Sequence, residues 1–63
     1  MANIADFSDA LTQEALLAKK YEKLAKEAIN LENKQALQEL VKLSEQKMKL
    51  IYNLMASINW FSE

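Results

Sequence analysis

Apolar residues recur at three- and four-residue steps in two long blocks, which is the spacing of an amphipathic helix. The first block runs from Phe7 to Leu31, and the second runs from Leu37 to Ile58. Lysine and glutamate occupy many of the positions between, and the alternation typical of a β-strand is nowhere sustained. The pattern predicts an all-α chain with one helix over about residues 7–31 and another over about residues 35–58.

Polar residues with capping chemistry mark the ends of these two helices. Asp6 or Ser8 is expected to cap the first helix, because both side chains can accept hydrogen bonds from free backbone amides. A polar stretch then predicts a joint at about residues 32–34, with Asn33 capping the second helix. The chain has no glycine, so an asparagine or an ordinary residue must supply any left-handed turn. One continuous helix is the alternative.

The apolar stripe of the second helix is too wide for a single partner helix. Leu43, Leu50 and Leu54 widen it on one flank and Tyr52 on the other, so it covers roughly 200° instead of the usual ~100°. We therefore predict a two-helix antiparallel hairpin that completes a four-helix bundle as a homodimer. The residues expected at the interface are Phe7, Leu17, Tyr21, Leu24, Leu50, Ile51, Leu54, Met55, Trp60 and Phe61.

Composition excludes several classes of function. The 63 residues include no cysteine and no histidine, which removes disulfides, thiol catalysis and imidazole metal ligands. Eight basic residues, all lysine, and a net charge of −1 argue against nucleic-acid binding. No run reaches the roughly 18 apolar residues of a membrane span, and the mixed charges disfavour a membrane-surface helix pair. We expect a cytoplasmic, non-enzymatic protein without a cofactor.

Two large aromatic residues, Trp60 and Phe61, stand close to the end of the sequence and are expected just past the last helical turn. Aromatic side chains contribute large contact areas to interfaces. We expect this tail to bind either the second copy or another protein.

Glu14 is the charged residue at the middle of the first apolar stripe. A buried carboxylate costs several kcal/mol unless it is paired, protonated or metal-bound. Glu14 is therefore either structural, being solvated or paired (for instance with Tyr21 of a second hairpin), or it is a metal-binding or active-site carboxylate. Glu45 is the second candidate, at the edge of the second stripe, where it either turns inward or reaches water.

Several of these residues form a familiar pattern. Glu14 is followed after six residues by Tyr21 and then by spaced alanines, and Glu45 precedes Met48 by three residues. Together with the aromatic tail, the segment from Glu14 to Trp60 resembles one half of a rubrerythrin-type, ferritin-like protein. The tail is similar to that of small spore coat proteins of this superfamily, which would imply a spore coat location.

The resemblance implies a four-helix bundle built around two iron or manganese ions. Glu14 and Glu45 from each of two chains would be the metal ligands, but Met48 stands where the family has a histidine. Loss of both imidazoles should weaken iron binding greatly. The resemblance therefore implies a structural or protein-interaction module with a degenerate metal site. The alternative is a carboxylate-bridged di-iron or di-manganese protein formed across the dimer.

Overall fold

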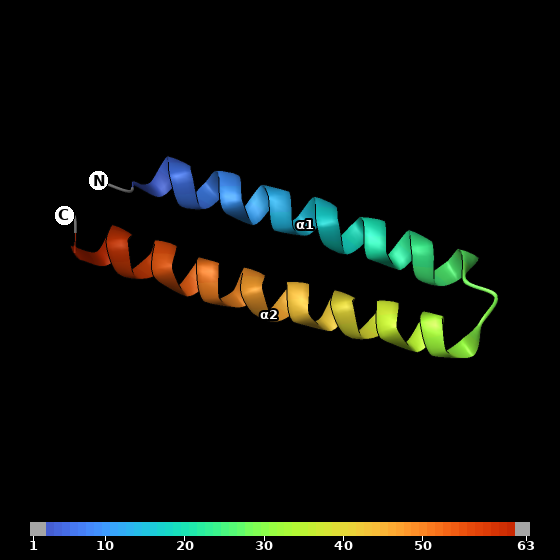
Figure 1. Cartoon of the computed structure of the whole chain (residues 1–63). Helices are drawn as coiled ribbons and strands as arrows, with labels where there is room; N and C mark the ends of the chain where they lie inside the picture. Colours follow the sequence, from blue (N-terminus) through green and yellow to red (C-terminus); the bar gives the residue numbers. More distant parts are fainter. Residues whose placement is uncertain (1–2, 62–63) are drawn as a thin grey trace.

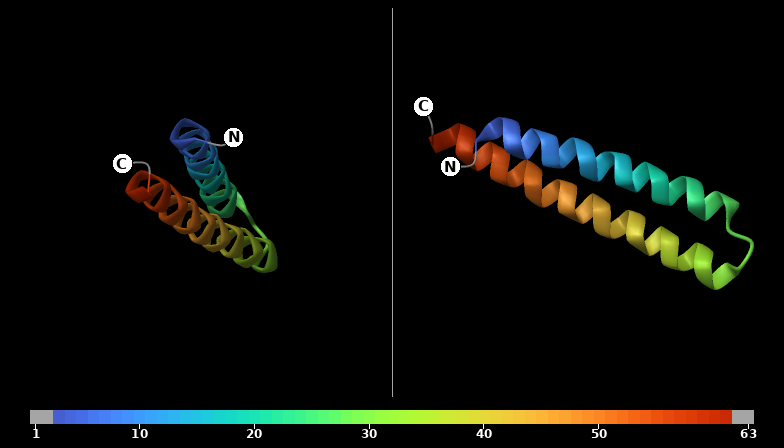
Figure 2. Two further views of the ribbon diagram at one scale, coloured as in Figure 1. Left: turned by 90° about the vertical axis from the view of Figure 1, so that its left-hand side faces the viewer. Right: turned by 45° about the horizontal axis from the view of Figure 1, so that its top comes forward.

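The computed structural model describes residues 3–61, with side chains through residue 58, as two antiparallel α-helices (Figure 1). Helix α1 spans Ile4–Glu27 and helix α2 spans Leu31–Phe61. Both chain ends lie at one end of the pair, and the joint at residues 28–30 lies at the other (Figure 2). Within residues 3–61 there is no strand, and residues 28–30 separate the two helices. The predicted all-α hairpin is therefore confirmed, and one continuous helix is excluded.

Helix α1 begins at Ile4, three residues earlier than predicted, because Asn3 caps it. The side-chain oxygen of Asn3 accepts a hydrogen bond from the backbone amide of Asp6 at 3.2 Å. The Asp6 carboxylate in turn accepts one from the backbone amide of Asn3 at 3.1 Å. This reciprocal capping box places Asp6 and Ser8 inside the helix instead of at its cap.

The joint lies four residues earlier than the predicted residues 32–34, because Asn30 rather than Asn33 caps α2. Its side-chain oxygen accepts hydrogen bonds from the backbone amides of Glu32 at 2.8 Å and Asn33 at 3.2 Å. Two orphan donors of the first turn are satisfied in this way. Leu31, which the sequence pattern assigns to the first helix, is consequently the first residue of α2.

The chain reverses without a left-handed residue. Ala28, at the end of α1, has φ −68° and ψ 127°, which is extended backbone that any residue adopts. None of the residues that the structure describes has a positive φ. The extended residue Ala28, followed by the Asn30 cap of α2, thus replaces the glycine turn that ends many helices.

Helix α2 continues through Phe61, beyond the predicted end at residue 58. The backbone of Trp60 and Phe61 is therefore helical, and the expectation of aromatics beyond the last turn is wrong. Their side chains lie outside the described part of the chain.

The two helices meet along a seam whose residues are alternately three and four apart, the a and d spacing of a coiled coil. The seam consists of Ile4, Phe7, Leu11, Glu14, Ala18, Tyr21 and Ala25 on α1, of Ala28 directly after that helix, and of Lys34, Leu37, Val41, Ser44, Met48, Ile51, Met55 and Ile58 on α2. Of the residues with described side chains, only Ala18, Ala25 and Ser44 are buried. These small residues can sit fully between the helices, whereas each larger seam residue keeps part of its surface open.

The pair is a rod without an enclosed core. Its extents are 50 × 15 × 14 Å, and its radius of gyration is 14.7 Å. A compact chain of this length would have a radius of gyration of about 10.6 Å. The apolar side chains of the seam are therefore covered on one side and open on another.

The cap at Asn30 can be tested against the cap predicted at Asn33. We expect Asn30→Ala to lower the free energy of unfolding by about 1 kcal/mol, since two backbone amides lose their acceptor. Asn33→Ala is the matched control and should change stability by less than about 0.5 kcal/mol, because alanine favours a helix interior. Urea unfolding at equal protein concentrations measures both changes. A larger loss for Asn33→Ala would place the joint at residues 32–34.

Candidate functional site

One side of the hairpin presents a continuous row of leucines, which we call the leucine face. It consists of Leu17 and Leu24 on α1 and of Leu40, Leu43, Leu50 and Leu54 on α2. Helical periodicity places all six beside the seam on the same side of the pair. A hollow lined by both Leu24 and Leu40 confirms that the two helices share this side. Leu50 is 64% exposed and Leu54 is 51% exposed, so the face is largely uncovered.

Among the described residues, one ion pair crosses the seam beside this leucine face. Nζ of Lys47 lies 3.8 Å from Oε1 of Glu14. Lys47 stands in the α2 row midway between Leu40 and Leu54, and its side chain is 64% exposed. The Glu14 side chain is only 16% exposed. The charged pair thus lies on the side of the hairpin that carries the leucines, next to Leu17.

Glu14 has unused hydrogen-bonding capacity. Its Oε1 atom is buried and accepts no hydrogen bond from any described residue. The 3.8 Å separation from Lys47 is an electrostatic contact, too long for a hydrogen bond. A pair with one exposed partner contributes little to stability, because water screens it. The hairpin alone therefore leaves this carboxylate incompletely satisfied.

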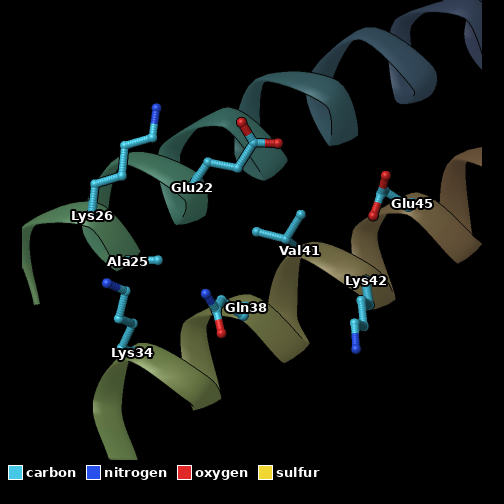
Figure 3. Close-up of a pocket in the computed structure, with 8 residues that line it drawn as sticks. All are labelled: Glu22, Ala25, Lys26, Lys34, Gln38, Val41, Lys42 and Glu45. Atoms are coloured by element: carbon cyan, nitrogen blue, oxygen red, sulfur yellow. The ribbon is translucent and has the colours of Figure 1, made fainter. Parts of the chain in front are cut away.

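The opposite side of the hairpin is charged. Figure 3 shows a shallow hollow there, between α1 and the first half of α2. Its lining residues are Glu22, Ala25, Lys26, Lys34, Gln38, Val41, Lys42 and Glu45. Carboxylates and ammonium groups both line it, so this side of the hairpin is favourable to leave exposed to solvent. The hairpin is therefore two-sided, with leucines on one side and mixed charges on the other.

The two predicted metal ligands lie on different sides. Glu14 lines a hollow on the leucine side with Leu17, whereas Glu45 lines two hollows on the charged side. Met48 lies in the seam and borders one of the Glu45 hollows. The described residues contain no group of three or more acidic side chains that could hold a metal ion. Within one chain, Glu14 has Lys47 as its neighbour and not a second carboxylate.

The predicted interface residues divide into two groups. Leu17, Leu24, Leu50 and Leu54 lie on the leucine face. Four others, Phe7, Tyr21, Ile51 and Met55, lie in the seam and are partly covered by the opposite helix of the same chain. The side chains of Trp60 and Phe61 fall outside the described residues.

Sequence reasoning missed Lys47 as the partner of Glu14. The signal was present, since Lys47 interrupts the leucine row that Leu40, Leu43, Leu50 and Leu54 form. Pairing Lys47 with Glu14 nevertheless needs the register of the two helices, and a joint placed four residues too late shifts that register. Leu40 and Leu43 were also left out of the predicted interface, although they belong to the same row.

Comparison with protein families, with curated proteins and with solved structures gives no match. The ferritin-like resemblance therefore stays a prediction. Neither described helix contains a stretch apolar enough to cross a membrane. The class that the fold itself defines is an antiparallel two-helix hairpin with one leucine face and one charged face.

The positions of the carboxylates lead to a prediction about metal content. We expect protein prepared without chelator to contain much less than one iron or manganese ion per chain, because Lys47 neighbours Glu14 and Glu45 lies on the other side. Elemental analysis by mass spectrometry measures this content. Stoichiometric metal that disappears in both Glu14→Gln and Glu45→Gln would instead establish the shared carboxylate site.

Proposed function

We propose that this protein is a non-catalytic structural or interaction module that works as a homodimer. Two hairpins pair through their leucine faces and form a four-helix bundle. The charged faces remain outside, in water. The observation that carries the proposal is that six leucines gather on one face of the hairpin, with Leu50 and Leu54 more than half exposed.

The surface area of the chain supports this assembly. The hairpin exposes 5321 Å². A compact monomer of 7.2 kDa would expose about 4,100 Å², so this chain exposes about 1,200 Å² more. Covering that excess on each of two copies buries about 2,400 Å² in total, which falls in the range of obligate homodimers.

The shape and chemistry of the face favour a second copy as the partner. The α2 row is regular, with Leu40 and Leu54 equally far from Lys47 on either side. A two-fold symmetric pair needs a surface that is complementary to itself, and a straight row of leucines with one balanced charge pair meets that need. Each leucine removed from water contributes about 1.5–3 kcal/mol when fully covered.

The dimer can be tested with two leucines of equal exposure on different sides. Leu50 is 64% exposed on the leucine face, and Leu16 is 62% exposed on the outer side of α1. We expect Leu50→Glu to weaken dimerisation by more than about 100-fold, because each copy would bury an unpaired carboxylate. Leu16→Glu should leave the dimer within about threefold of wild type. Light scattering coupled to size-exclusion chromatography measures molar mass over a dilution series.

Circular dichroism on the same samples reports whether dissociation is coupled to loss of helix. Leu50→Glu yields either a folded monomer or an unfolded chain, and both outcomes agree with a core completed by the second copy. A wild-type chain that stays monomeric and cooperatively folded at micromolar concentration would overturn the proposal. Equal effects of the two substitutions would place the interface elsewhere.

A further inference from the structure

The orientation of the two copies can be derived from the position of the ion pair between Glu14 and Lys47. This step rests on the proposed dimer. Two identical hairpins can pair their leucine faces with two-fold symmetry in two ways, with the joints at the same end or at opposite ends. Both arrangements make all neighbouring helices antiparallel, and both place the α2 leucine row, which is symmetric about Lys47, in the interface.

The two arrangements bring different helices together. With the joints at the same end, the symmetry axis runs along the bundle, and α1 of one copy lies against α2 of the other. With the joints at opposite ends, the axis crosses the bundle, so α1 lies against α1 and α2 against α2. The choice therefore decides which side chains of the leucine face meet.

Glu14 and Lys47 distinguish these arrangements because they lie at the same level of the hairpin, on different helices. When the joints share an end, Glu14 of one copy comes to the level of Lys47 of the other. The four charges then alternate around the bundle. When the joints are at opposite ends and the ion pairs of the two copies lie at the same height along the bundle, Glu14 of one copy approaches Glu14 of the other, and Lys47 approaches Lys47. Like charges in a desolvated interface are strongly unfavourable.

The unsatisfied carboxylate supplies a second argument for the alternating arrangement. Glu14 Oε1 is buried and accepts no hydrogen bond from the described residues of its own chain. Lys47 carries three donors on a side chain that is 64% exposed on the leucine face, so it can reach across to a second copy. Paired with a lysine from each copy, the carboxylate would gain the donors that the single hairpin does not provide.

We infer that two copies associate with their joints at the same end, held in this orientation by a ring of four alternating charges made by Glu14 and Lys47 of each chain. The leucines provide the affinity, and the charge ring selects one orientation. A shared carboxylate metal site would instead need the two Glu14 side chains side by side. The orientation of the dimer thus separates these two interpretations of Glu14.

A distance between the two joints tests the orientation directly. The chain has no cysteine, and Ile29 is fully exposed in the joint, so Ile29→Cys accepts a spin label away from the leucine face. Helices pack 8–10 Å apart, so the same-end arrangement predicts a label separation below about 25 Å by pulsed electron resonance. The opposite-end arrangement predicts a separation above about 36 Å, the length of a 24-residue helix. Leu16→Cys, labelled near the middle of α1, gives similar distances in both arrangements and controls for labelling.

Charge variants test whether the ring sets the orientation. Glu14→Lys, which places four positive charges together, should weaken the dimer by at least about tenfold. The double swap Glu14→Lys with Lys47→Glu should restore affinity to within about threefold and keep the short joint distance. The double variant Glu14→Leu with Lys47→Leu should remain dimeric but show both the short and the long distance, since the leucine rows fit either way.

The outcomes separate this inference from the proposed dimer. A monomeric wild-type protein would contradict both the proposed dimer and its orientation. A dimer whose joint labels are far apart would overturn the same-end orientation and leave the dimer standing. A short distance that persists alone in the double leucine variant would show that the charges do not select the orientation.

Discussion

Two helices cannot enclose a core, and the other features of this molecule follow from that constraint. Each seam residue has the opposite helix on one side and water on another, so among the described side chains only those as small as Ala18, Ala25 and Ser44 are buried. Larger residues such as Phe7 and Ile51 contribute only part of their apolar area to the fold of a single chain. The hydrophobic stabilisation available to a chain this short is limited in any case. The leucine face is the surface through which additional burial can be gained.

The division of the hairpin into two faces shows how much of this could be predicted from the sequence. The two helices, the hairpin and the wide stripe of α2 follow directly from apolar periodicity, because a side chain's face depends only on its position in its own helix. Helical periodicity places Leu43, Leu50 and Leu54 on one flank and Tyr52 on the other, and Tyr52 indeed lines a hollow together with Glu45.

Contacts between the helices were harder to predict, because they depend on where the chain reverses. Both Asn30 and Asn33 are good capping residues, and three residues separate them. In an antiparallel pair, moving the joint by four residues shifts the partner of every α1 residue by about eight positions along α2. That shift hides the proximity of Glu14 and Lys47. Propensity alone does not choose between the asparagines.

Glu14 illustrates why a protein with so little core keeps a charge inside it. A leucine at this position would give an unbroken apolar seam, and replacing buried charges by apolar residues often stabilises a protein. An unbroken row of leucines also fits a second copy equally well in more than one orientation, which is a known weakness of uniform interfaces. A charged residue that is satisfied in only one arrangement removes that ambiguity at some cost in stability. In the proposed dimer, Lys47 stands midway along the α2 leucine row with Glu14 beside it in the seam, so this pair bears directly on the choice between the two orientations.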